Sequence, residues 1–352
     1  MQALTEGRYT IGLTSVAMFF VLSGFLIARS AANSPSIGRF LWHRFLRIFP
    51  GYWICLIVCA CAFAPLMAYV DSGSLTRVFS LPWNSPQSFM INNAGVLHLN
   101  GLSIEGVVMF RPNSIGGVLR NNPIPGVLNG SLWTLPYELG CYLAVAAAAA
   151  ITILRRLRPF VLVLFAGMWG LHAFDCLDPE AFWRWFPYVG FKQLVMLGLF
   201  FCAGCVCFLY REKIPFSRAL FVGALVVLGI GTAAGVFGLV APVAMTYAFL
   251  WLAFALPFAR FDARGDFSYG TYIYAFPIQQ GLALLRLPET GFAAYFLCSL
   301  LMTLLMAFLS YRLVEAPCLR WKHLPFAFRN PRKRSAAAGD EIGPVPSAVP
   351  AA

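Results

Sequence analysis

The sequence predicts an all-α protein, a polytopic bundle of transmembrane helices with about nine spans. Of its 352 residues, 60% are hydrophobic and only 11% are charged, whereas a soluble domain carries about 25% charged residues. Apolar stretches close to the ~20 residues that cross a bilayer recur along the chain, without the short alternating segments of a transmembrane β-barrel. Most of the surface must therefore face lipid, where helices satisfy their own backbone hydrogen bonds.

Nine apolar stretches follow one another, and we expect each to form one helix. The first and fourth are short, and only a few residues separate the sixth from the seventh. The expected spans are 11–28, 48–70, 132–154, 159–174, 190–210, 217–235, 238–258, 267–286 and 291–312.

These spans and their connections make residues 1–325 a membrane-embedded domain. Residues 326–352 follow it with a short basic run and then a stretch rich in Ala, Pro and Gly. We expect this end to be a disordered basic tail, because it has too little apolar surface to bury.

The distribution of Lys and Arg predicts the orientation. Nineteen of the 26 lie in alternate connections and in the C-terminal tail, all on one side of the membrane. Positive charge marks the cytoplasmic side, so we expect an integral protein of the cytoplasmic (inner) membrane with a cytoplasmic C-terminus. The net charge of +12 then reflects orientation and requires no nucleic acid. Nine spans would put Met1 outside, so we expect one further helix to be missing before residue 11.

One connection, residues 71–131, is much longer than the others. It has about sixty residues, is rich in Gly, Asn, Ser and Pro, and lies on the expected extracytoplasmic side. Loops of this length are usually functional or disordered. The sequence leaves two interpretations open, a lid over a site and a solvated linker.

Two carboxylates lie in or at the end of expected spans, where an ionised group is costly. Glu138 follows Pro136 just inside the third span. It could be a general base, an acceptor of a substrate hydrogen bond, or the partner of a buried Arg. Glu315 ends the last span, and either a salt bridge to a neighbouring Arg or a substrate contact would explain it.

Two arginines, Arg44 and Arg47, are three residues apart and hence share one helical face. Two adjacent guanidinium groups suit a phosphorylated ligand at the membrane face, and anchoring to anionic lipid is the alternative. No metal pattern occurs, because the four His are unpaired at ligand spacing and Cys202-x-x-Cys205 has no second ligand pair. We therefore expect no metal and no permanently bound cofactor.

Five segments follow one another in the chain and, with the preceding Gly12 and Val16, cover residues 12 to 317. They are Phe19-Phe-Val-Leu-Ser-Gly-Phe-Leu-Ile27, Arg44-x-x-Arg47-Ile-x-Pro50, Ser131-Leu-Trp-Thr-Leu-x-x-Glu138, Phe267-Ser-Tyr-Gly-x-Tyr272 and Val314-Glu-x-Pro317. In this order they resemble the motifs of the acyltransferase 3 family, integral membrane proteins that move acyl groups from acyl-CoA to extracytoplasmic carbohydrates.

The resemblance implies a membrane-bound O-acyltransferase with acyl-CoA as donor co-substrate, a carbohydrate or lipid-linked glycan as acceptor, and membrane lipids around it. It implies that Arg44 and Arg47 contact the CoA phosphates, that Glu138 is an acceptor-site or structural carboxylate, and that Ser23-Gly24 is a point of close helix packing. In place of the family's His, Glu138 is the candidate catalytic residue. The remaining expected substrate contacts are Ser23, Tyr269 and Glu315.

One family feature is not found in the sequence. The family's first helix carries an Arg and, about ten residues later, a His taken as the catalytic base, and no His of this chain occupies that position. Two other classes of function therefore stay open. One is a catalytically inactive membrane scaffold, and the other is a transporter of the acyl group or glycan, although internal repeats are not evident.

Overall fold

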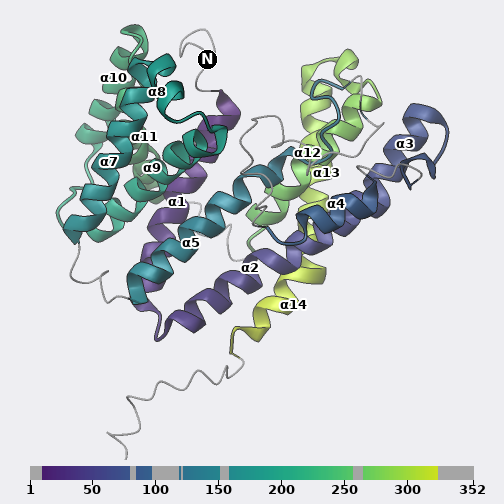
Figure 1. The fold of residues 1–352 in the computed structure, drawn as a ribbon, viewed down its shortest axis with the longest axis horizontal. Helices are drawn as coiled ribbons and strands as arrows, with labels where there is room; N and C mark the ends of the chain where they lie inside the picture. Colours follow the sequence, from purple (N-terminus) through teal and green to yellow (C-terminus); the bar gives the residue numbers. More distant parts are fainter. Residues whose placement is uncertain are drawn as a thin grey trace, which may run out of the picture. The chain divides into compact units, whose positions relative to one another are not determined.

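The computed structural model describes residues 10–79, 85–96, 119, 122–150, 158–256 and 265–323. Helices dominate these ranges and none of their residues forms a strand (Figure 1). The predicted all-α class is confirmed. The chain divides into Met1–Lys322 and His323–Ala352. The predicted tail, 326–352, lies outside the described residues.

A helix occupies each of the nine expected spans. Two short helices, α4 (Pro86–Asn93) and α8 (Pro179–Trp185), lie between them. The nine are α1 (Ile11–Asn33), α2 (Ile37–Val58) with its continuation through a π-helical turn (Cys59–Phe63) into α3 (Ala64–Ser72), α5 (Leu135–Ala150), α7 (Arg158–Leu177), α9 (Val189–Leu209), α10 (Arg218–Ala233), α11 (Phe237–Ala255), α12 (Ser268–Leu284) and α13 (Phe292–Ser310).

In the described ranges, six helical segments are long and apolar enough to cross a membrane. They start at Ile11, Ile37, Arg158, Val189, Phe237 and Phe292. The three others, α5, α10 and α12, have 16, 16 and 17 residues. Since ~20 residues cross a bilayer core, these three are short for a span.

The second helix begins earlier than predicted. Ser36 caps its start by accepting a hydrogen bond from the backbone N–H of Arg39, and helical structure continues from Ile37 to Val70 over 34 residues. That length is about 50 Å, against a hydrocarbon core of about 30 Å. Arg44 and Arg47 therefore belong to the same helix as the span and not to a separate cytoplasmic segment. The predicted span, 48–70, left out these first turns because their polar side chains lower the hydropathy of this part of the sequence.

Helices α1 and α9 meet backbone to backbone at two glycines. A Cβ atom on Gly24 would lie 2.0 Å from the carbonyl oxygen of Phe201, and a Cβ on Gly204 would lie 2.0 Å from that of Val21. The Cys205 thiol donates to the Gly24 carbonyl at 3.3 Å. The close packing expected at Gly24 is confirmed, since small residues let helix backbones approach.

The helices form two groups within residues 10–323. In one, α1 and α7 pack on α9, and α10 packs on α11, which also contacts α7 and α9. In the other, α12 packs on α13 and on α2, and α2 contacts the π-helical turn Tyr311–Glu315. Helix α5 contacts α1, α2 and α9 and thereby joins the groups (Figure 1). Polar residues of α1, α2 and α5 consequently meet inside the bundle.

The end of the long loop is built into this bundle. The side-chain amide of Gln280 on α12 donates to the backbone carbonyls of Ile124 and Val127 at 2.8 and 2.7 Å. Asn122 donates to the Gln280 carbonyl at 2.8 Å, and Asn129 to that of Ile273 at 2.9 Å. Non-helical backbone at membrane depth needs such partners. Asn122 and residues 127–129 of the loop are therefore buried in the bundle and are not a solvated linker, while a lid over a site stays a prediction; residues 80–84, 97–118 and 120–121 lie outside the described ranges.

Candidate functional site

The six residues singled out in the sequence come together where α1, α2, α5 and α12 meet. Ser23 lies on α1, Arg44 and Arg47 on α2, Glu138 on α5, and Tyr269 on α12. Glu315 lies in the π-helical turn after α13. Hydrogen bonds or electrostatic interactions connect each of them to another member or to a shared neighbour.

Glu138 is buried at 5% exposure in the first turn of α5. A 3-10 turn, Gly130–Thr134, precedes the helix, and the Asn129 side chain caps it by accepting from the backbone N–H of Ser131 at 3.1 Å. One helical turn after Glu138, the hydroxyl of Tyr142 donates to its carboxylate. The hydroxyl of Ser23 in turn donates weakly to Tyr142 at 3.5 Å. The buried carboxylate is thus held from α1 through a tyrosine.

Arg44 and Arg47 both act electrostatically on this carboxylate from α2, and Arg44 has partners of its own. Its guanidinium donates to the hydroxyl of Ser30 at 3.2 Å and interacts electrostatically with Tyr142 and Glu138. The Nε atom is buried and has no hydrogen-bond partner. Because an unpaired buried donor is costly, this N–H is available for an acceptor atom of a bound ligand.

Arg47 is paired differently. It makes an ion pair with Asp266 at 2.5 Å, with the two side chains 39% and 33% exposed. Asp266 also accepts from the backbone N–H of Ser268 at 3.1 Å and from its hydroxyl at 2.5 Å. Partial burial alone would raise the pKa of Asp266, but the charge of Arg47 and these hydrogen bonds outweigh it and lower the pKa below its usual range.

Tyr269 and Glu315 close the side of the site nearest α13. The hydroxyl of Tyr269 donates to the Ile48 carbonyl at 2.9 Å, and its ring fits because Gly51 has no side chain; a Cβ there would lie 2.9 Å from Tyr269 Cε1. The buried Glu315 carboxylate accepts from the Ser310 hydroxyl at 3.0 Å. The neighbouring Arg312 does not pair with Glu315, because its guanidinium lies over the ring of Phe308. The salt-bridge explanation of Glu315 is therefore wrong for this neighbour.

Sequence reasoning missed four polar residues of the site. Tyr142 donates to Glu138, and Asp266 pairs with Arg47. Ser30 accepts from Arg44, and Ser310 donates to Glu315. Tyr142 could have been predicted from the sequence, because it lies four residues after Glu138 and hence on the same helical face. The other three lie in segments with no distinguishing pattern.

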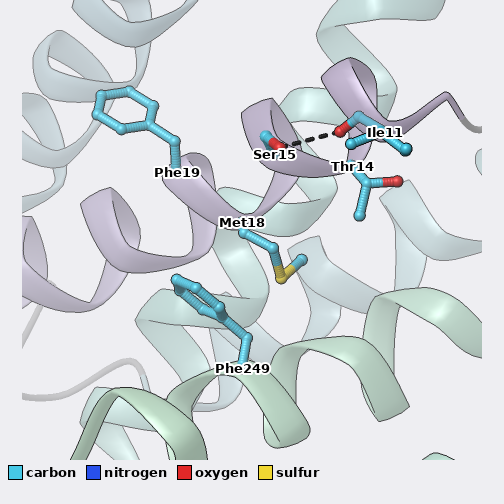
Figure 2. A pocket seen from close by; sticks show the side chains of 6 residues that line it. All are labelled: Ile11, Thr14, Ser15, Met18, Phe19 and Phe249. Atoms are coloured by element: carbon cyan, nitrogen blue, oxygen red, sulfur yellow. Dashed lines mark hydrogen bonds between the residues drawn. The ribbon is translucent and has the colours of Figure 1, made fainter. Parts of the chain in front are cut away.

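A pocket of about 410 Å³ opens beside the first turns of α1 (Figure 2). Its lining is mostly apolar and comes from α1 and α11: Ile11, Thr14, Ser15, Met18, Phe19 and Phe249. The Phe19 ring stacks on Tyr272, with centroids 5.9 Å apart. Tyr272 donates to the Ser131 carbonyl at 2.7 Å and also bonds the Thr134 hydroxyl. Ser23 lies one helical turn beyond Phe19, about 6 Å along the axis, so this aromatic pair stands near both the pocket and the polar site.

The acyltransferase 3 family, described as an acyltransferase domain, matches residues 2–312. The chain belongs to this family. Among curated proteins, the O-acetyl transferase of Shigella phage Sf6 is 26% identical over 322 residues, which are 88% of this chain and 85% of that protein. The exopolysaccharide production protein ExoZ of Rhizobium meliloti (strain 1021) is 28% identical over 177 residues, 47% of this chain and 51% of that protein. No solved structure matches.

This acyltransferase is thus an integral membrane protein, and the resemblance seen in its motifs is confirmed. The family match covers α1 to α13 and ends before Glu315. Within it, Glu138 is a buried carboxylate that accepts from the Tyr142 hydroxyl. A buried carboxylate can accept a proton, and guanidinium and hydroxyl donors beside it can stabilise developing negative charge.

Proposed function

We propose that this protein is an O-acyltransferase that moves an acyl group, in the simplest case acetyl, from acyl-CoA to a hydroxyl of an extracytoplasmic or lipid-linked carbohydrate. The names of the two relatives, an O-acetyl transferase and an exopolysaccharide production protein, support acetyl as the group and polysaccharide as the acceptor. The observation that carries the proposal is the gathering of Glu138, Tyr142 and Arg44 inside the bundle.

Glu138 accepts the proton of the acceptor hydroxyl in this proposal. The hydroxyl oxygen attacks the thioester carbon, so that a C–O bond forms, and collapse of the tetrahedral intermediate breaks the C–S bond. The proton held on Glu138 then passes to the departing CoA thiolate. We assign the guanidinium of Arg44 and the Ser23 hydroxyl as donors to the oxyanion, and a preorganised donor of this kind contributes a factor of about 10²–10³ to kcat.

The position of Arg44 refines the role that the family resemblance implies for it. In CoA, the extended pantetheine arm separates the thioester from the nearest phosphate by on the order of 15 Å. Arg44 interacts electrostatically with Tyr142 and Glu138, which supports a place for its guanidinium at the thioester end in this proposal. We assign Arg44, and Arg47 beside it, to the thioester end of the donor.

The acceptor enters from the opposite side in this proposal. The pocket beside the first turns of α1 combines apolar and aromatic walls with the hydroxyl of Ser15, a composition common in ligand pockets. The charge distribution puts this end of α1 outside and the C-terminus in the cytoplasm. The Phe19–Tyr272 pair would then lie between the acceptor pocket and Glu138.

The test is transfer of radiolabelled acetyl from acetyl-CoA to membrane glycans of cells that express the chain, compared with cells that do not. We expect label in the glycan fraction, and a loss of at least tenfold with Arg44→Ala. Arg218→Ala, an exposed arginine at the start of α10, is the control and should keep full transfer. Absence of transfer with intact CoA binding would favour the inactive scaffold. Glycan export without acetylation would favour the transporter.

A further inference from the structure

Helix α12 contains a proline that leaves one backbone carbonyl without its usual donor. Pro277 lies inside the helix and is buried. Because proline has no N–H, the carbonyl four residues earlier, at Ile273, receives no hydrogen bond from it. A buried carbonyl at membrane depth needs another donor. The end of the long loop supplies one, since the side-chain amide of Asn129 donates to the Ile273 carbonyl at 2.9 Å.

Asn129 uses both ends of its side-chain amide. The oxygen accepts from the backbone N–H of Ser131 at 3.1 Å and caps the 3-10 turn Gly130–Thr134, which leads into α5. The nitrogen bonds the Ile273 carbonyl and lies 3.5 Å from the Cys55 thiol on α2. The side chain is 0% exposed. A serine would serve for the cap alone, so the longer amide is needed only for the contact with α12.

The same short segment lies against α12 at two further places. The Tyr272 hydroxyl donates to the Ser131 carbonyl at 2.7 Å. Gly130 packs on the ring of Phe276, where a Cβ would lie 2.6 Å from Cε2. Helix α5 begins directly after this turn and carries Glu138 in its first turn. Because turn and helix are continuous, a shift of the turn relative to α12 is passed on to the Glu138 carboxylate.

We propose that Asn129 is a positioning residue for Glu138, and that it acts by tying the turn before α5 to the carbonyl that Pro277 frees in α12. The inference rests on the proposed function, in which Glu138 takes the proton of the acceptor hydroxyl. A misplacement of about 1 Å can lower a catalytic rate about 10²-fold. Loss of the tie should therefore lower kcat and leave the use of acetyl-CoA at low concentration limited by the same KM.

The experiment measures radiolabelled acetyl transfer to membrane glycans over a range of acetyl-CoA concentrations. In Asn129→Ser, the hydroxyl keeps an acceptor for the cap but is one bond too short to reach Ile273. We expect kcat to fall at least tenfold with KM for acetyl-CoA unchanged. In a Glu138→Gln background the same change should cause no further loss, since residues that act through one group are not additive. Asn92→Ser, at an exposed position of α4, is the matched control.

The variant Pro277→Ala tests the tie itself, on the purified full chain in detergent. Alanine restores an N–H that can donate to the Ile273 carbonyl within the helix. Asn129→Ser should therefore lower the thermal midpoint by about 2 °C when Pro277 is present, and by less in the Pro277→Ala background. Equal losses in the two backgrounds would show that the amide does not serve the freed carbonyl.

Two kinetic results would overturn the positioning role. One is a wild-type kcat for Asn129→Ser, and the other is an equal further loss in the Glu138→Gln background, which would indicate a general loss of structure. Failure of the proposed function looks different. The wild type would then transfer no acetyl, or Glu138→Gln would transfer it at the wild-type rate; the positioning role would fall with it, while the thermal midpoints would still report the tie.

Discussion

Tyr142 lies one helical turn after Glu138 on α5, and its hydroxyl donates a hydrogen bond to the Glu138 carboxylate. Both side chains are buried, at 3% and 5% exposure. The same hydroxyl accepts from Ser23 on α1, while Arg44 approaches from α2. A carboxylate that would otherwise be costly in the membrane is therefore fixed in position by three helices.

The first prediction concerns this pair. Glu138→Gln keeps the shape of the side chain but removes the base, so acetyl transfer should fall by about 10²–10⁴-fold with acetyl-CoA binding preserved. Tyr142→Phe leaves the carboxylate without its fixed donor and should lower kcat about tenfold. Tyr137→Phe on the same helix, whose hydroxyl donates to Gln193, is the control. Full activity of Glu138→Gln would exclude it as the base.

The second prediction is a pH dependence at Asp266. Its pKa is below the ordinary value of 3.8 in the folded protein because of Arg47 and Ser268. Because the pKa of Asp266 is lower in the folded than in the unfolded protein, its ionised form stabilises the fold at pH values above 3.8. This stabilisation is lost as the pH falls through the pKa of the folded protein. The thermal midpoint of the wild type in detergent should therefore fall more between pH 5 and pH 3 than that of Asp266→Asn. We expect a difference of about 2 °C, kept small by the partial exposure of both partners.

Arg47→Met gives a second arm of this measurement. Without the guanidinium, the pKa of Asp266 should return toward its ordinary value, and the acid-dependent loss should shrink as it does in Asp266→Asn. Equal acid profiles for the wild type and both variants would show that the ion pair contributes no measurable pH dependence.

The helices and the six site residues could be predicted from the sequence, but the contacts among these residues could not. Long apolar stretches identify spans because a bilayer demands them. Glu138 was visible because a charge in such a stretch is rare, and Arg44 and Arg47 were visible because their three-residue spacing puts them on one helical face. The early start of α2 was missed because its first turns are polar. Asp266 was missed because it lies in a connection, where a charged residue is ordinary. Only the packing of α2 against the segment before α12 makes it part of the site.

The third prediction tests the crossing of α1 and α9. Gly24→Ala and Gly204→Ala each place a methyl group 2.0 Å from a backbone carbonyl oxygen of the other helix, and backbone cannot rotate away as a side chain can. Overpacking of this kind typically costs 1–3 kcal/mol, so the thermal midpoint should fall by several degrees. Gly229→Ala on α10, where a Cβ would meet nothing within 4 Å, is the matched control. Equal midpoints in all three variants would contradict the close crossing.

The last prediction concerns the buried end of the long loop. Gln280→Leu removes the amide that donates to the carbonyls of Ile124 and Val127, leaving two backbone acceptors without that donor in the membrane. Hydrogen bonds between membrane segments contribute about 0.6 kcal/mol each on average and up to about 1.7, so we expect a destabilisation of about 1–3 kcal/mol. Activity should fall as well, because residues 122–134 lead directly into the turn before Glu138. The neighbouring Gln279 is exposed, and Gln279→Leu should leave both stability and activity near wild type. If the two leucine variants behaved alike, the Gln280 side chain would not be what holds this segment against α12.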